Sequence, residues 1–178
     1  MAISGIFILS ALRGPVADEV RRIQLEYDPK LAAMNRPHIT ITGSSGVGPL
    51  PPSVTAHQLR ERLAPIAAST PPLTLRLQRP HRFMQSNIVS FPLDPHGPLR
   101  VLHDRIATSG LPFTPARFPF TPHCTIHFYP ELTPEKLLAL LRLRIKEPAV
   151  IDCLQCFFTQ DPQPAKKLLE LPLTGETA

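Results

Sequence analysis

The 178-residue chain contains no tryptophan, two tyrosines and only three cysteines. An odd number of cysteines argues against a framework of disulfide bonds. Cys153 and Cys156 have the spacing of a metal-binding or redox pair, but no second cysteine pair is present to complete a zinc site. Both lie in a segment rich in valine, isoleucine and phenylalanine that predicts a strand. We therefore interpret them as reduced residues of the core.

Long apolar runs and long basic runs are also missing. The apolar stretch at residues 6–12 is too short to cross a bilayer and no basic residue precedes it. We therefore expect a cytoplasmic protein with no membrane partner. The formal net charge of +5 favours an anionic partner such as a phosphate or RNA, although no cluster of lysine and arginine strengthens that signal.

A loop rich in glycine and serine spans residues 43–49. Its backbone N–H groups could hold a phosphate, but the loop lacks the Gly-Lys-Ser/Thr ending of a P-loop. The sequence therefore favours a flexible connector over a phosphate-binding loop.

What the chain does contain is a short motif that occurs twice, as PHITI at residues 37–41 and PHCTI at residues 122–126. In a strand, residues two apart point to the same face, so His38 shares a face with Thr40, and His123 with Thr125. The residues between them are apolar and point into a core. Each copy therefore predicts a strand that presents one imidazole and one hydroxyl.

Two imidazoles and two hydroxyls suit the in-line cleavage of a phosphodiester. One histidine would remove a proton from the attacking oxygen, and the other would donate one to the leaving oxygen, because imidazole titrates near neutrality. The threonine hydroxyls could hydrogen-bond the non-bridging oxygens of the phosphate. This chemistry needs no metal and no cofactor.

The pair of His-x-Thr motifs resembles the signature of the two-histidine (2H) phosphoesterase superfamily, which includes 2′-5′ RNA ligase-like proteins and cyclic nucleotide phosphodiesterases. Both motifs, their order and their separation fit the signature. The resemblance covers most of the chain and implies a bilobal α+β fold in which the motifs face each other across a central cleft. It also implies that His123 activates water and that His38 protonates the leaving ribose oxygen; the residues themselves do not assign these roles.

The two halves of the chain predict the same order of elements, namely strand, helix, motif strand, helix, strand. Positions 38 and 123, which are 85 apart, define two diverged repeats at about 1–80 and 86–174 within a single domain, 1–178. We expect antiparallel sheets at the cleft, helices outside and a pseudo-twofold axis between the lobes. The expected elements are strands at 4–12, 37–42, 73–77, 88–93, 120–129, 149–159 and 167–173, and helices at 15–27, 56–66, 97–109 and 134–145.

Further residues are candidates for binding the substrate. Thr42 and His127 follow the motifs at strand spacing, so we expect them to line the cleft or support it. Arg36 and Arg117 could each bind a phosphate with two hydrogen bonds, and Tyr129 could stack on a base. The strand parity predicts that Phe128 is a core residue, and the four remaining histidines are expected to be solvated: His57, His81, His96 and His103.

The sequence therefore predicts a monomeric, metal-independent phosphoesterase that acts on a 2′,3′-cyclic phosphate or related phosphodiester of RNA ends or small nucleotides. Three alternatives remain open. The same site could join RNA ends as a 2′-5′ RNA ligase, or the chain could bind RNA or nucleotides without turnover. The histidines could also bind a metal, although no aspartate or glutamate recurs at ligand spacing beside either motif.

Overall fold

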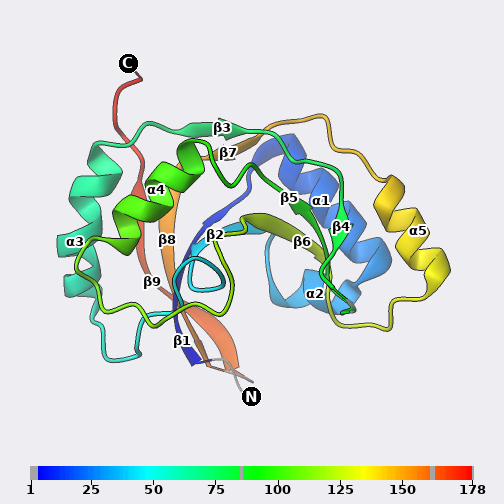
Figure 1. Ribbon diagram of the computed structural model, residues 1–178, viewed down its shortest axis with the longest axis horizontal. Coiled ribbons are helices and arrows are strands. Elements are labelled where there is room, and N and C mark those ends of the chain that lie inside the picture. The colour runs from blue at the N-terminus through cyan, green and yellow to red at the C-terminus, as the bar shows by residue number, and fades with distance from the viewer. Residues whose placement is uncertain (1–3, 85, 161–162, 178) are drawn as a thin grey trace.

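The computed structural model describes residues 4–84, 86–160 and 163–177 and has an α+β fold with two lobes (Figure 1). The first lobe is built around a four-stranded sheet of order β2-β1-β8-β9, and the second around a three-stranded sheet of order β4-β5-β6. A two-stranded ribbon, β3-β7, connects them. The strand bounds are β1 Ser4–Ala11, β2 His38–Thr42, β3 Leu73–Leu75, β4 His81–Arg82, β5 Val89–Pro92, β6 His123–His127, β7 Ala149–Ile151, β8 Cys153–Gln160 and β9 Gln163–Pro172. The helix bounds are α1 Gly14–Tyr27, α2 Pro29–Met34, α3 Ala56–Ala68, α4 Pro98–Ala107 and α5 Pro134–Arg142.

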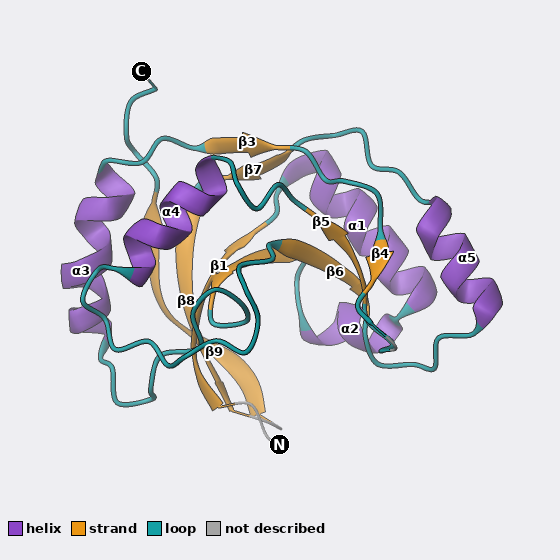
Figure 2. Cartoon of the chain, in the orientation of Figure 1, coloured by secondary structure: helices purple, strands orange, loops and turns teal. Residues whose placement is uncertain are grey.

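All of the strand pairs are antiparallel, which confirms the predicted fold class. The ribbon of β3 and β7 crosses from one lobe to the other in Figure 2. β3 belongs to the first half of the chain and β7 to the second, so the halves pair with each other in this ribbon. The motif strands β2 and β6 contact each other below it, at the junction of the lobes (Figure 1).

Each motif strand is covered by a helix from the other half of the chain. Helix α1 of the first half packs on β6, and helix α4 of the second half packs on β2. The apolar face of α1, with Val16, Val20 and Ile23 buried, provides one of these contacts. The lobes therefore exchange helices and do not correspond to contiguous halves of the sequence.

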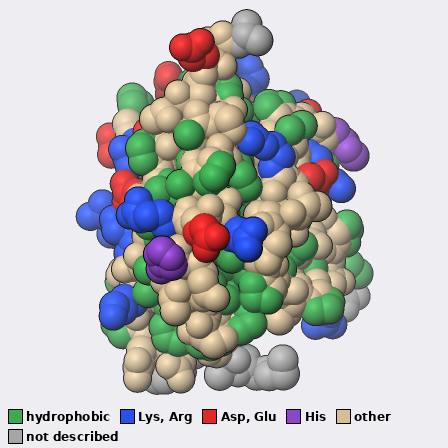
Figure 3. Space-filling view, turned by 90° about the vertical axis from the view of Figure 1, so that its left-hand side faces the viewer, with side chains coloured by type: hydrophobic (Ala, Val, Ile, Leu, Met, Phe, Trp, Pro, Cys, Tyr) green, Lys and Arg blue, Asp and Glu red, His purple; other side chains and the backbone are tan. Residues whose placement is uncertain are grey.

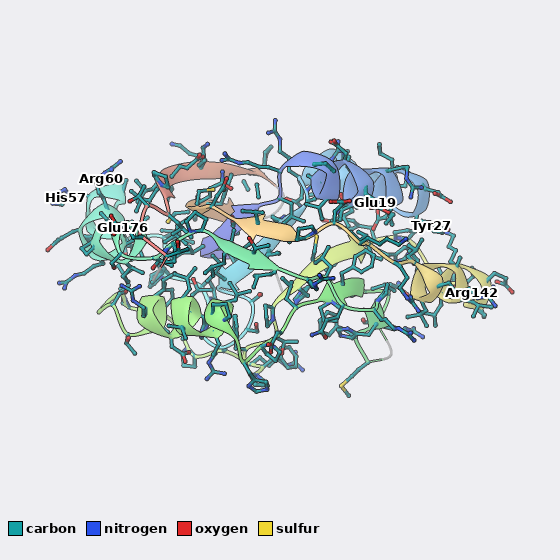
Figure 4. The ribbon with its side chains drawn as sticks, turned by 90° about the horizontal axis from the view of Figure 1, so that it is seen from above. Glu19, Tyr27, His57, Arg60, Arg142 and Glu176 are labelled. Atoms are coloured by element: carbon teal, nitrogen blue, oxygen red, sulfur yellow. The ribbon has the colours of Figure 1, made fainter. Side chains whose placement is uncertain are left out.

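The ends of the molecule carry the remaining helices. Helix α3 begins with the predicted capping box, in which the Thr55 hydroxyl accepts from the Gln58 backbone and the Gln58 side chain accepts from the Thr55 backbone. It packs against β9 at one end, where Figure 4 shows His57 and Arg60. Helix α5 lies at the opposite end with Arg142. The face that includes α3 mixes cationic, anionic and apolar side chains (Figure 3), so this face has no single-sign patch that indicates a ligand.

The predicted order of elements is confirmed in both halves as β1-α1-β2-α3-β3 and β5-α4-β6-α5-β7. The structure adds the short helix α2 and the strand β4, and it divides the strand expected at 149–159 at Asp152. The resulting strands β7 and β8 belong to different sheets. Local periodicity does not reveal this division, because both strands are similarly apolar.

The same β-bulge occurs in each motif strand. Thr42 and Thr40 pair with Ile8 and Leu9, so Ile41 is an extra residue in β2. In β6 the extra residue is Ile126, since His127 and Thr125 pair with Val89 and Ser90. The extra residues are 85 apart, like the histidines, but their partner strands are related by 81 positions. The repeat is therefore not described by one constant offset.

The loop at residues 43–49 is not a flexible connector. The backbone N–H of Gly46 donates to Phe118 O and that of Gly48 donates to Thr114 O, and the hydroxyl of Ser45 accepts from the backbone N–H of Thr121. Since these groups already have partners, the loop has few N–H groups left for a phosphate. It instead fastens the end of β2 to the segment that leads into β6.

Candidate active site

The two motif histidines are held in the same way. Nδ1 of His38 lies 2.7 Å from the carbonyl oxygen of Arg36, and Nδ1 of His123 lies 2.7 Å from that of Thr121. A carbonyl oxygen can only accept, so each Nδ1 carries the proton and donates it. In the neutral ring, Nε2 then keeps its lone pair. Each histidine is therefore oriented and set in the tautomer that a base at Nε2 requires.

The two histidines lie close enough to interact electrostatically. Burial lowers the pKa of His38, opposed by its hydrogen bond to Arg36. Burial also lowers the pKa of His123, which is lowered further by the positive charges of His38 and His81 and raised by its bond to Thr121. Protonation of His38 therefore disfavours protonation of His123.

The structure places Thr40 and Thr125 where the strand pattern predicts. Both are partly exposed, on the same faces as the histidines, while Ile39 and Cys124 between them are buried. The buried Gln24 of α1 donates to the carbonyl oxygen of Thr125 at 2.9 Å. Burial raises the pKa of Cys124 to about 12, so its thiol stays protonated and does not offer a nucleophile.

The expectation that Thr42 and His127 line the cleft is wrong, because both side chains are fully buried. The extra residue of the bulge reverses the alternation of faces, so the residue after it points inward. The same reversal turns Phe128 outward, and its side chain is 42% exposed. Strand alternation without the bulge predicts a core residue at this position. Thr42 and His127 are left to support the motif strands, and His127 donates from Nδ1 to the carbonyl oxygen of Asn87.

The other candidate residues lie outside the two motif strands. The Arg36 side chain is exposed, although its backbone holds His38. Arg117 is exposed and lies over the ring of Phe118, 5.3 Å from its centroid. Tyr129 lies beyond the end of β6, where Lys30 of α2 lies 4.3 Å from the centroid of its ring. All three remain candidates for binding the substrate.

Asp28 has a structural role at the C-terminal end of β6. Its fully buried carboxylate accepts from the backbone N–H groups of Leu31, Phe128 and Tyr129. It therefore caps α2 and fastens the end of β6 to the first half of the chain. The sequence shows only an Asp-Pro pair where α1 ends.

The structure also corrects the expectation for two of the remaining histidines. His103 is only 3% exposed and packs on Phe120, with its Nδ1 at 2.8 Å from Asp104. His81 is half-buried in β4, beside the second motif, where its charge adds to burial in lowering the pKa of His123. The sequence signal for His81 is weak, because β4 is two residues long and its pairing with β5 is not visible in the local pattern.

Two features are not found among the described residues. Residues 4–84, 86–160 and 163–177 contain no group of three or more histidine, cysteine, aspartate and glutamate side chains suited to a metal ion. No helix in the same part of the chain is both long and apolar enough to cross a membrane. The cysteines of the chain are free and buried, as predicted.

Comparison with known proteins gives one family and several solved structures. The sequence-family model of the 2′-5′ RNA ligase superfamily matches residues 12–157 of the chain. A crystal structure of E. coli LigT with 3′-AMP has 16% identity and a TM-score of 0.59, over 96% of this chain and 98% of that one. The protein TT0787 of Thermus thermophilus has 13% identity and a TM-score of 0.67, over 99% and 100%.

A further crystal structure, described as a phosphoesterase, has 19% identity and a TM-score of 0.60, over 96% of this chain and 98% of that chain. At these identities the structures show a shared fold. No curated protein matches the sequence of the chain.

Proposed function

The chain belongs to the 2′-5′ RNA ligase superfamily, and from this premise we propose that it hydrolyses 2′,3′-cyclic phosphates or related phosphodiesters of RNA ends or nucleotides. The observation that carries the proposal is the matched orientation of His38 and His123, each donating from Nδ1 to a carbonyl oxygen two residues before it. Two partly exposed imidazoles on strands that contact each other would supply the base and the acid of an in-line displacement.

The surroundings of the two histidines favour different roles. Burial lowers the pKa of both rings, and the charge of His38 lowers that of His123 further, which favours His123 as the neutral ring that a general base needs. His38 would then donate its proton from Nε2 to the leaving ribose oxygen. The hydroxyls of Thr40 and Thr125 would donate to the non-bridging oxygens, where negative charge develops.

The similar proteins support a nucleotide substrate. Structures of E. coli LigT contain 3′-AMP, NADP+ or ATP. The same fold with a two-histidine site can accept a ribose and a phosphate in this chain. The superfamily is named for 2′-5′ RNA ligases, so the reverse reaction, 2′-5′ joining of RNA ends, is a second candidate. The same acid and base would serve both directions.

Hydrolysis of the four nucleoside 2′,3′-cyclic phosphates and of an RNA with a cyclic-phosphate end, in the presence of a chelator, tests the proposal. We expect turnover by the wild type and a loss of about 1000-fold in kcat for His38→Ala and for His123→Ala. His57→Ala, which removes an exposed histidine from the outer face of α3, is the matched control.

A strict requirement for an added divalent metal, or unchanged turnover in both motif variants, would overturn the proposal. Incubation of the same RNA with a 5′-hydroxyl partner and separation of the products would show whether joining accompanies cleavage.

A further inference from the structure

A third histidine faces the site from the second lobe. His81 of β4 pairs with Ser90 of β5, and Ser90 pairs with Thr125 of β6. Residues directly opposite each other in antiparallel strands point to the same face, so His81 and Thr125 share a face. Two strand spacings separate them, which amounts to about 10 Å.

Phe83 fills the space between two of the histidines. Its ring packs edge-on against His81, with the centroids 4.7 Å apart, and edge-on against His123, 4.8 Å apart. His81 and Phe83 are both only partly buried. The three rings thus form a continuous aromatic wall that begins at the motif histidine and ends at His81.

The first motif has no corresponding wall. The four-stranded sheet has β1 and β8 beside β2, and no ring contact with His38 is found in the described part of the chain. The aromatic wall therefore lies on the His123 side of the site. A function that both histidines share does not explain it.

We propose that His81 is a specificity-determining residue that contacts the nucleobase of the substrate. The proposal rests on the proposed function and deepens it. The backbones of Thr125 and His81 are about 10 Å apart. A phosphate bound at Thr125 is too small to reach His81, but a ribose with its base is long enough. Phe83 provides a flat apolar surface along that path, and the imidazole of His81 can hydrogen-bond the edge of a base.

A neutral ligand group suits His81 better than a second phosphate. Burial lowers the pKa of His81, so its ring is largely uncharged at neutral pH. A neutral imidazole offers one donor and one acceptor, as the edge of a base does, whereas a phosphate offers acceptors only.

Two cyclic phosphates that differ in the presence of a base test the inference. The substrates are the nucleoside 2′,3′-cyclic phosphates and methyl β-D-ribofuranoside 2,3-cyclic phosphate, which keeps the ribose and has a methoxy group in place of the base. His81→Ala is expected to lower kcat/KM for the nucleoside esters about tenfold, mainly through KM, and to leave the methyl riboside ester within about twofold of the wild type. His81→Gln, which keeps a donor and an acceptor, is expected to recover part of the loss.

Control variants separate this role from a structural one. His57→Ala should change neither substrate, and Phe83→Leu should lower the turnover of both, because Phe83 also packs on His123. An equal loss on both substrates in His81→Ala would assign His81 to support of the site and would overturn the inference, as would no loss on either. A loss confined to the RNA end would place the contact on the neighbouring nucleotide and would also overturn it.

A binding measurement keeps the inference distinct from the proposed function. Calorimetric titration of nucleoside 3′-monophosphate and of inorganic phosphate does not depend on turnover. His81→Ala should weaken the nucleotide about tenfold and leave phosphate unchanged. If the wild type hydrolyses neither cyclic ester but shows this binding difference, the hydrolytic function fails and the base contact stands.

Discussion

The two half-sites share their internal geometry and differ in what surrounds them. Each has a histidine fixed at Nδ1 by a carbonyl oxygen two residues earlier and a bulge at the third residue after the histidine. Among the residues that the structure describes, a phenylalanine ring packs on the histidine of the second half-site only, and His81 lies near it. The shared features are those that a two-imidazole mechanism needs, and we propose different roles for the two histidines from the differences.

The ends of the two motif strands are also fastened differently. After β2, the loop at residues 43–49 bonds to the segment before β6, and the Ser45 hydroxyl accepts from Thr121. After β6, the side chain of Asp28 accepts from the backbone N–H groups of Phe128 and Tyr129. Both connections cross between the halves of the chain, but the second uses a fully buried acidic side chain at the strand end.

Breaking the second connection is expected to give the largest loss of stability. Asp28→Ala removes a side chain that accepts from three backbone N–H groups and leaves those donors without this acceptor. We expect the free energy of unfolding to fall by about 3 kcal/mol. Denaturant unfolding measures it, with Asp18→Ala, an exposed aspartate of α1, as the control.

Ser45→Ala, which breaks one bond of the first connection, should cost only about 1 kcal/mol. Equal losses for Asp28→Ala and Ser45→Ala would contradict the difference between the two connections.

Removing one hydroxyl from either motif should slow the reaction by a comparable factor. Thr40→Val and Thr125→Val keep the shape of the side chain but remove a donor to the phosphate oxygens. Each is expected to lower kcat about 100-fold with little change in the free energy of unfolding. Steady-state kinetics on a nucleoside 2′,3′-cyclic phosphate gives the ratio. A large effect in only one variant would show that the phosphate is held by one lobe.

The smallest expected effect is a displacement of the pH optimum. Burial lowers the pKa of both motif histidines below the ordinary 6.5, so at pH 7 most molecules have neither ring protonated. The active form needs one proton, on His38. The rate should therefore rise as the pH falls from 7 and decline again once His123 is protonated.

We accordingly expect a bell-shaped profile of kcat/KM with its maximum below about pH 6.5. An optimum above about pH 7 would contradict the lowered pKa values.

Much of this arrangement follows from the local pattern of the sequence. The apolar alternation in PHITI and PHCTI predicts both motif strands, and it places His38, Thr40, His123 and Thr125 on exposed faces. The capping residue Thr55 predicts where α3 begins.

The rest depends on contacts between distant residues. The bulges at Ile41 and Ile126 arise from pairing with β1 and β5, and they bury Thr42 and His127 against the simple parity rule. The position of His81 beside His123 likewise depends on the pairing of β4 with β5, two strands away from the motif. A single sequence carries no local signal for either.

The difference between the half-sites is tested most directly by a substrate whose leaving group needs no acid. Turnover of bis(p-nitrophenyl) phosphate is compared with that of a nucleoside 2′,3′-cyclic phosphate in the wild type, His38→Ala and His123→Ala. If His38 is the acid and His123 the base, His38→Ala regains most of the wild-type rate on the nitrophenyl ester and His123→Ala does not. Equal recovery or equal inactivity of the two variants would contradict the assignment of separate roles.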